Sequence, residues 1–246
     1  MRHLVKWLWV LTLFSVAMGF LETTVVVYLR EIFYPNGFHF PLAALPGKLA
    51  SIEILREAAT LIMLVCIGFL AGKNPLQRCS VFMYCFGVWD ISYYVFLKLL
   101  LGWPSSLFTR DILFLIPFPW IGPVLAPCLL SLTLIFFALV ITYFQHLGKK
   151  VALQGFPRIL ILLGCLGVIL SFLKEYFFYM IRLKKTGQYS LLTHGIFSGV
   201  KPFYPQSFNW VIFCTGEGLI LTGIFLLVTN WCRLGNNHSL KRREGH

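Results

Sequence analysis

The chain has 246 residues, of which 58% are hydrophobic and 12% are charged, and its formal net charge is +12. Because soluble domains carry about 25% charged residues, this composition excludes an ordinary soluble protein and indicates a polytopic membrane protein. The positive charge lies mostly beside apolar segments, where attraction to anionic lipid and control of topology explain it. We therefore expect the lipid bilayer as a partner, and no nucleic acid.

Six apolar segments are long enough to cross a bilayer, which requires roughly 20 apolar residues per helix. In chain order they are residues 4–28, 52–72, 79–101, 123–146, 157–181 and 209–232. The first segment begins like a signal peptide, but its apolar run resumes after Glu22 and exceeds a secretory h-region, so we interpret it as an uncleaved helix. The predicted fold is an all-α polytopic membrane helix bundle, with a single transmembrane domain at 1–232 and a basic, disordered tail at 233–246.

The connection between the third and fourth predicted spans, residues 102–122, is unusually apolar. Its stretch LFTRDILFLI has apolar residues at helical spacing but is too short to cross the membrane. Prolines follow at 117, 119 and 123. We predict a short helix here that is either interfacial or re-entrant. The re-entrant arrangement requires that irregular backbone be buried in protein or line a water-filled cavity.

Lysine and arginine between the spans indicate the orientation. If the N-terminus lies inside, the inner segments hold eleven of these residues and the outer segments hold seven, spread over longer loops. The positive-inside rule then places both termini in the cytoplasm. The RLKK cluster at 182–185 favours the opposite orientation.

Cysteine and histidine give no indication of a cofactor. The seven cysteines are odd in number, lack a Cys-x-x-Cys spacing and lie mostly inside the predicted spans. We interpret them as small packing residues rather than as a disulfide framework or a zinc site. No histidine lies well inside a span, which disfavours haem held by two histidines and a His-rich zinc or di-iron centre. We predict neither a cofactor nor a metal site.

Besides Lys6 and Arg158 at the inner ends of their spans, nine charged residues lie inside the predicted spans, and a rise of about 1.5 Å per residue places these nine at the midplane or in the half away from the termini. A charge at the bilayer centre costs about 2.5–3.5 kcal/mol, so such residues normally face the bundle interior and mark function. Tyr94 shares a helical stripe with two of them. We predict one buried, acid-rich site formed by Glu22, Glu53, Arg56, Glu57, Asp90, Tyr94, Lys98, Lys174, Glu175 and Glu217.

Structural roles are the alternative for individual members of this set. Arg56 and Glu57 would form an ion pair that fixes helix register, and Lys98 would reach the interface along its own aliphatic stem. Glu53 would lie in the headgroup layer. Taken together, six carboxylates face only three cations in this set. We therefore expect that some of the carboxyls carry protons or that a cation binds among them.

Two runs of residues resemble a family of uncharacterised bacterial polytopic membrane proteins: EILREAATLIML at 53–64 and GVWDISYYVFLKLLLGWP at 87–104. The similarity extends through DILFLIPFPWIGPVLAP at 111–127. The resemblance implies a bacterial inner membrane protein but no activity. It also implies that the family pattern includes Glu53, Arg56, Glu57, Trp89, Asp90, Tyr93, Tyr94 and Lys98.

Three functions fit these observations. The first is proton- or cation-linked transport of a small solute or ion, although six spans without a visible repeat are few for a carrier and a homodimer would supply more. The second is an accessory or assembly subunit of a larger membrane complex. The third is an enzyme acting on a lipid or isoprenoid, with Glu or Asp as acid and base and Tyr94 or Lys98 stabilising an anion. The sequence leaves open whether the protein is an enzyme.

Overall fold

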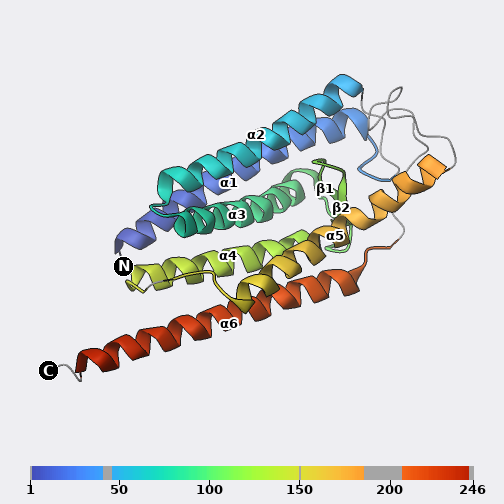
Figure 1. The fold of residues 1–246 in the computed structure, drawn as a ribbon. Helices are drawn as coiled ribbons and strands as arrows, with labels where there is room; N and C mark the ends of the chain where they lie inside the picture. The colour runs from blue at the N-terminus through green and yellow to red at the C-terminus, as the bar shows by residue number, and fades with distance from the viewer. Residues whose placement is uncertain (1, 41–45, 150, 186–206, 244–246) are drawn as a thin grey trace.

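The computed structural model of the chain describes residues 2–40, 46–149, 151–185 and 207–243 (Figure 1). It contains six helices and, between the third and fourth, a two-stranded hairpin. All six helices are long and apolar enough to cross a membrane, which confirms an all-α polytopic bundle. The elements are α1 (Arg2–Phe33), α2 (Gly47–Ala71), α3 (Pro75–Leu101), β1 (Arg110–Phe114), β2 (Trp120–Pro123), α4 (Leu125–His146), α5 (Phe156–Lys185) and α6 (Trp210–Arg243).

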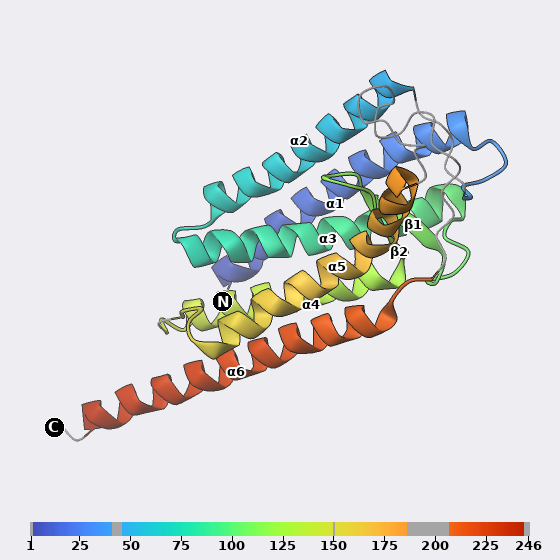
Figure 2. The same ribbon diagram turned by 45° about the vertical axis from the view of Figure 1, so that its right-hand side comes forward.

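The long helices lie side by side, with the hairpin at one end of the bundle and both termini at the other (Figures 1 and 2). Helix α3 is central because it packs against α1, α2 and α4, while α5 packs mainly against α6 and β2. An even number of crossings requires both termini on one side. That this side is the cytoplasm of a bacterium stays a prediction from the distribution of Lys and Arg and from the family resemblance.

The hairpin corrects the prediction of a short helix between the third and fourth spans. Helix α3 stops at Gly102, whose left-handed φ of +65° closes its last turn. The apolar stretch that follows pairs as an antiparallel strand, with Asp111 opposite Gly122. Pro117 and Pro119 lie in the turn, where their missing N–H groups and restricted φ favour a reversal over a helix. Helical spacing of apolar residues therefore misled the prediction.

Helices α5 and α6 approach closely because glycines line their contact. A Cβ placed on Gly164 would lie 2.5 Å from the carbonyl oxygen of Gly216, far inside van der Waals contact. Large apolar side chains then complete the core of this half, among them Phe172 and Phe213, each 1% exposed. On the outside, side chains such as Leu70 and Val211 are exposed, which suits a surface that faces lipid.

Helix α6 extends beyond the predicted sixth span, which ends at residue 232. It continues as a helix to Arg243. No proline occurs between Trp210 and Arg243 to interrupt the backbone hydrogen bonds. Residues 244–246 lie outside the described residues.

Candidate polar site

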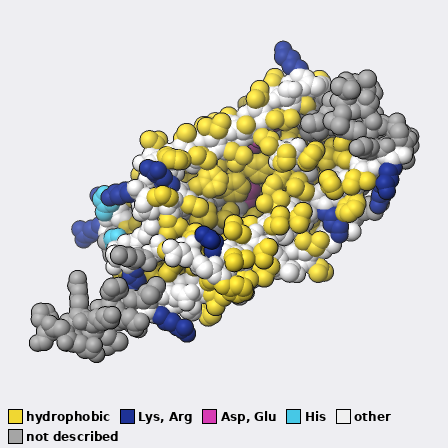
Figure 3. Space-filling view, viewed as in Figure 1, with side chains coloured by type: hydrophobic (Ala, Val, Ile, Leu, Met, Phe, Trp, Pro, Cys, Tyr) yellow, Lys and Arg dark blue, Asp and Glu magenta, His cyan; other side chains and the backbone are white. Residues whose placement is uncertain are grey.

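A polar pocket lies between α1, α2, α3 and the hairpin, with a volume of about 50 Å³. On the face of the molecule that Figure 3 shows, Asp or Glu atoms lie at the bottom of a recess surrounded by hydrophobic side chains. The residues that line the pocket are Glu22, Val26, Arg56, Glu57, Thr60, Trp89, Asp90, Tyr93, Tyr94, Ile112, Leu113 and Phe114. A space of this size holds a few water molecules or one small charged group.

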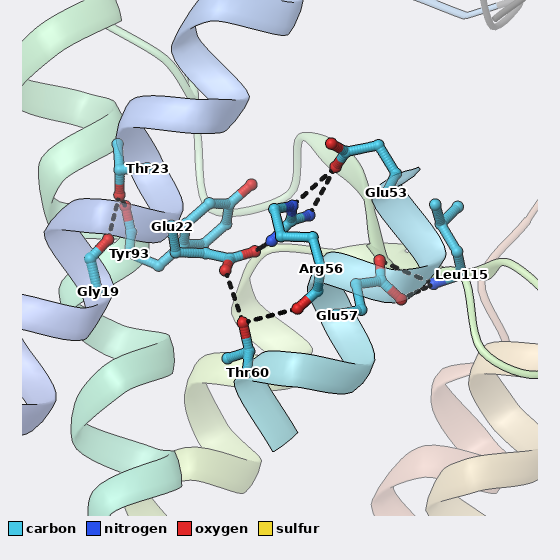
Figure 4. A network of polar contacts seen from close by, with 9 residues as sticks. All are labelled: Gly19, Glu22, Thr23, Glu53, Arg56, Glu57, Thr60, Tyr93 and Leu115. Atoms are coloured by element: carbon cyan, nitrogen blue, oxygen red, sulfur yellow. Dashed lines mark hydrogen bonds and ion pairs between the residues drawn. The ribbon is translucent and has the colours of Figure 1, made fainter. Parts of the chain in front are cut away.

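Arg56 is held between two carboxylates at one wall of the pocket (Figure 4). Its Nη1 contacts Glu22 on α1, and its Nε and Nη2 both donate to one oxygen of Glu53, each at 2.8 Å. The Thr60 hydroxyl lies 3.3 Å from the second oxygen of Glu22. The guanidinium is therefore engaged by two acids, Glu22 and Glu53.

Glu57 fastens the hairpin to α2. Both of its carboxylate oxygens accept the backbone N–H of Leu115, at 2.8 and 3.1 Å (Figure 4). Its side chain is buried, and no Lys, Arg or His nitrogen of a described residue lies within 4.0 Å of its carboxylate oxygens. The i, i+4 spacing of Glu53 and Glu57 places both on the bundle face of α2, as the sequence predicts.

Asp90 joins α3 to α4. Its Oδ2 accepts a hydrogen bond from the Ser131 hydroxyl at 2.8 Å, and the residue is only 8% exposed. Like Glu57, it forms no ion pair with any described residue. Two buried carboxylates therefore face the same pocket without a cation of their own.

Aromatic side chains complete the pocket. Tyr93 and Tyr94 lie side by side with ring centroids 5.0 Å apart, and the ring centroids of Trp89 and of Phe114 in the hairpin are 6.0 Å apart. The indole N–H of Trp89 is buried and has no hydrogen-bond partner among the described residues. A donor in this position is satisfied by a water molecule or by an acceptor on a bound ligand.

A second buried ion pair, which the sequence analysis did not anticipate, holds the base of the hairpin. Arg30 at the end of α1 donates to Asp111 of β1 at 2.9 Å, and its guanidinium lies 3.8 Å from the ring centroid of Trp103. Burial raises the pKa of Asp111 to about 6, and Arg30 opposes this shift, so the carboxyl is ionised at neutral pH. Both residues lie outside the predicted spans, so only the pairing in space reveals their relation.

Four residues assigned to the predicted site lie elsewhere, which corrects the expectation of one common cavity. Lys98 is exposed and donates to the carbonyls of Gly102 and Pro104 at the end of α3. Lys174 is half-buried and makes no ion pair with a described residue. Lys98 lies eight residues beyond Asp90, which is about 12 Å further along α3 at about 1.5 Å per residue, so the shared helical stripe does not bring it to the pocket.

The other two are Glu175 and Glu217. Glu175 accepts the Ser207 N–H at 2.6 Å and lies 3.9 Å from Arg110 of β1, so it braces the outside of the hairpin. Glu217 is buried on α6, accepts the Thr133 hydroxyl of α4, and does not line the pocket. Its second oxygen has no partner among the described residues.

No family model matches this chain, and neither a curated protein nor a solved structure matches it. The resemblance to bacterial membrane proteins therefore stays a prediction, and the function has to be argued from the site. Within the described residues, no three His, Cys, Asp or Glu side chains lie close enough to share a metal ion. The pocket thus presents its carboxylates singly, each held by a separate donor, rather than as a set of metal ligands.

Proposed function

We propose that this integral membrane protein carries out proton- or cation-linked transport, with Glu57 and Asp90 as the groups that bind the proton or cation. The observation that supports this is the charge balance of the pocket wall. Four carboxylates belong to this region, Glu22, Glu53, Glu57 and Asp90, and a single guanidinium is shared by the first two. Neither Glu57 nor Asp90 forms an ion pair with a described residue.

Uncompensated charges inside a membrane are costly, which is why intramembrane acids commonly belong to proton relays and ion pathways. A proton or a cation that enters the pocket offsets this cost. The acids differ from a purely structural pair because free space adjoins them and because they bind different elements, Glu57 the hairpin and Asp90 helix α4. Binding a charge at this point therefore alters contacts to both parts of the bundle.

The direct test is flux through the full chain reconstituted in liposomes that contain a pH-sensitive dye. We expect proton movement down an imposed gradient and at least a tenfold loss of rate in Asp90→Asn and in Glu57→Gln. Both substitutions keep an oxygen acceptor, for Ser131 and for the Leu115 N–H respectively, so the fold is retained. Glu217→Gln is the matched control because it removes a buried carboxyl outside the pocket. Full rates in the two pocket variants, or no flux in the wild type, would contradict the proposal.

An enzyme acting on a lipid or isoprenoid is the second candidate, and the apolar recess above the pocket is the observation that favours it (Figure 3). In that case Glu57 or Asp90 would act as acid or base and Tyr94 as an anion-stabilising donor. Lys98 has no part in it because it lies at the exposed end of α3. Chemical change in bilayer lipids incubated with the protein, lost in Asp90→Asn, would favour this candidate. The role of an assembly subunit, in a homodimer or a larger complex, stays a prediction.

A further inference from the structure

We infer that the substrate of this site is an amphiphilic cation, with an amine headgroup that binds in the polar pocket and an apolar tail that stays in the membrane. This inference rests on the proposed function and names its substrate class. It is based on the position of the pocket, its charge, its aromatic lining and its size.

The position of the pocket favours entry of a substrate from the lipid. In both Figures 1 and 2, α3 lies between α2 and α5. Helix α2 packs on α3, whereas α5 packs mainly on α6 and β2. The recess in this face is bordered by hydrophobic side chains and has acidic atoms at its bottom (Figure 3). In a bilayer, such a recess is filled by an apolar chain, because lipid is the surrounding solvent.

A row of half-buried aromatic rings marks where that chain would lie. Phe82 and Phe86 are one turn apart on α3, with ring centroids 5.9 Å apart, and Phe86 stacks on Phe114 of the hairpin at 6.2 Å. Phe114 also lines the pocket. From Phe82 to Asp90 the row follows α3 for about 12 Å at 1.5 Å per residue, the length of an alkyl chain of roughly ten carbons.

The charge selects the headgroup. Glu57 and Asp90 lack cationic partners among the described residues, so a positive group gains two favourable interactions that a neutral or negative one does not. Trp89 and Tyr93 belong to the same lining, and aromatic rings attract alkylated ammonium groups. At about 50 Å³ the pocket admits such a headgroup but not the whole molecule, which leaves the tail outside along the aromatic row.

Binding then couples to protons by exchange. The ammonium group enters as the carboxyl of Glu57 or Asp90 releases its proton to water at the hairpin end, so the net charge in the pocket is unchanged. Return of a proton to the carboxylate releases the amphiphile. No covalent bond of the substrate changes.

The test uses the full chain in a neutral maltoside detergent, with dodecyltrimethylammonium as the probe. Tryptophan fluorescence measures binding and a weakly buffered pH indicator measures proton release. We expect dodecyltrimethylammonium to bind at least tenfold more tightly than tetramethylammonium, which has no tail, and than dodecyl sulfate, which has the same tail and a negative head. We also expect close to one proton released per molecule bound.

Variants separate the two parts of the substrate. Asp90→Asn should weaken dodecyltrimethylammonium binding at least tenfold, and the double variant Asp90→Asn with Glu57→Gln should abolish proton release, whereas Glu217→Gln should change neither. Phe86→Ala should weaken binding of dodecyltrimethylammonium several-fold without affecting tetramethylammonium. Equal affinity for the probes with and without a tail would overturn the inference in favour of an aqueous cation site. Equal affinity for dodecyl sulfate would overturn it as nonspecific partition.

The two proposals fail in different ways. Proton flux that depends on Asp90, without any binding of dodecyltrimethylammonium, would refute the amphiphile and leave transport standing. Binding with proton release but no flux in liposomes would refute transport and identify the pocket as a binding site for an amphiphilic cation.

Discussion

Asp90 and Glu217 form a matched pair within one molecule. Both are buried carboxylates on membrane-spanning helices, and both accept a hydrogen bond from a hydroxyl of α4, Ser131 for Asp90 and Thr133 for Glu217. Yet Asp90 lines a pocket that other carboxylates share, and Glu217 does not line it. A buried acid in a span is therefore not a site in itself, and its surroundings decide what it can bind.

The surroundings of Asp90 and Glu217 also differ in the contacts that hold each region together. Around Glu217, glycines bring α5 and α6 into backbone contact, and Gly216 packs against Gly164. Around Asp90, the hairpin is held against α1 and α2 by side chains, through Arg30 and Asp111 and through Glu57 and Leu115. Small-residue packing also occurs around α3, where a Cβ on Gly87 would lie 2.7 Å from the carbonyl oxygen of Ser131, so the polar attachments of the hairpin are what set the pocket region apart.

The largest expected effect on stability comes from breaking the charged wall of the pocket. Arg56→Met leaves Glu22 and Glu53 buried without their cation, and removing one partner of a buried ion pair costs about 3–5 kcal/mol. We expect about 3 kcal/mol, since the side chain is 19% exposed. Unfolding in mixed micelles of maltoside and dodecyl sulfate measures it. Lys174→Met, at a half-buried cation that pairs with no described acid, should change stability by less than about 0.5 kcal/mol. Equal losses in the two variants would contradict the network.

Asp111, whose carboxylate is paired with Arg30, extends the comparison between Asp90 and Glu217. Asp111 holds its proton more tightly in the folded protein, with a pKa of about 6, than at the usual value of 3.8. Its contribution to stability is therefore complete below pH 4 and lost as the pH rises through 6. Relative to Asp111→Asn, we expect the wild type to lose on the order of 3 kcal/mol between pH 4 and 7, at about 1.36 kcal/mol per unit.

The readout for Asp111 is the slope of stability against pH. The variant leaves Arg30 unpaired at every pH, so the offset between the two curves carries no information about the titration. Parallel curves for the wild type and Asp111→Asn, measured in the same micelles at pH 4, 5, 6 and 7, would refute the assignment. Tyr94 and Asp90 also interact with the Asp111 carboxyl, so both residues are kept as in the wild type when the two curves are compared.

The tightly packed half can be broken without touching the pocket. Gly164→Leu forces α5 and α6 apart, and overpacking of this kind costs about 1–3 kcal/mol. Flux through the pocket at a temperature where the variant is folded should match the wild type. Gly218→Ala is the control, because a Cβ at Gly218 meets nothing within 4 Å. A Gly164→Leu variant as stable as the control would show that the close contact is not required.

The smallest expected effect concerns Lys98, which the sequence placed in the site and the structure places at the end of α3. Lys98→Met removes a cation that donates to two carbonyls at the helix C-terminus, an interaction worth about 0.3–1 kcal/mol. Proton flux should stay within twofold of the wild type. A tenfold loss of flux with normal stability would return Lys98 to the transport site.

The sequence by itself determined the elements that depend on local properties. A bilayer demands a run of roughly 20 apolar residues for each helix, and all six helices follow from this requirement. Neighbours on one helix are equally predictable, because residues three or four apart share a face. Glu53 and Glu57 accordingly both face the bundle, although Arg56 pairs with Glu53 and not with Glu57, the partner named in the structural alternative.

Only the tertiary structure decided which residues meet across the bundle. Arg30 and Asp111 are 81 positions apart, and Glu57 bonds to a backbone group 58 positions away. Depth in the membrane follows from the rise of each helix, but the direction a side chain faces depends on how that helix is rotated against its neighbours. That rotation is set by packing between distant segments, such as Gly164 against Gly216 and the hairpin against α2. For this reason similar depth in the membrane brought Glu22, Glu57 and Asp90 to one pocket and left Glu217 outside it.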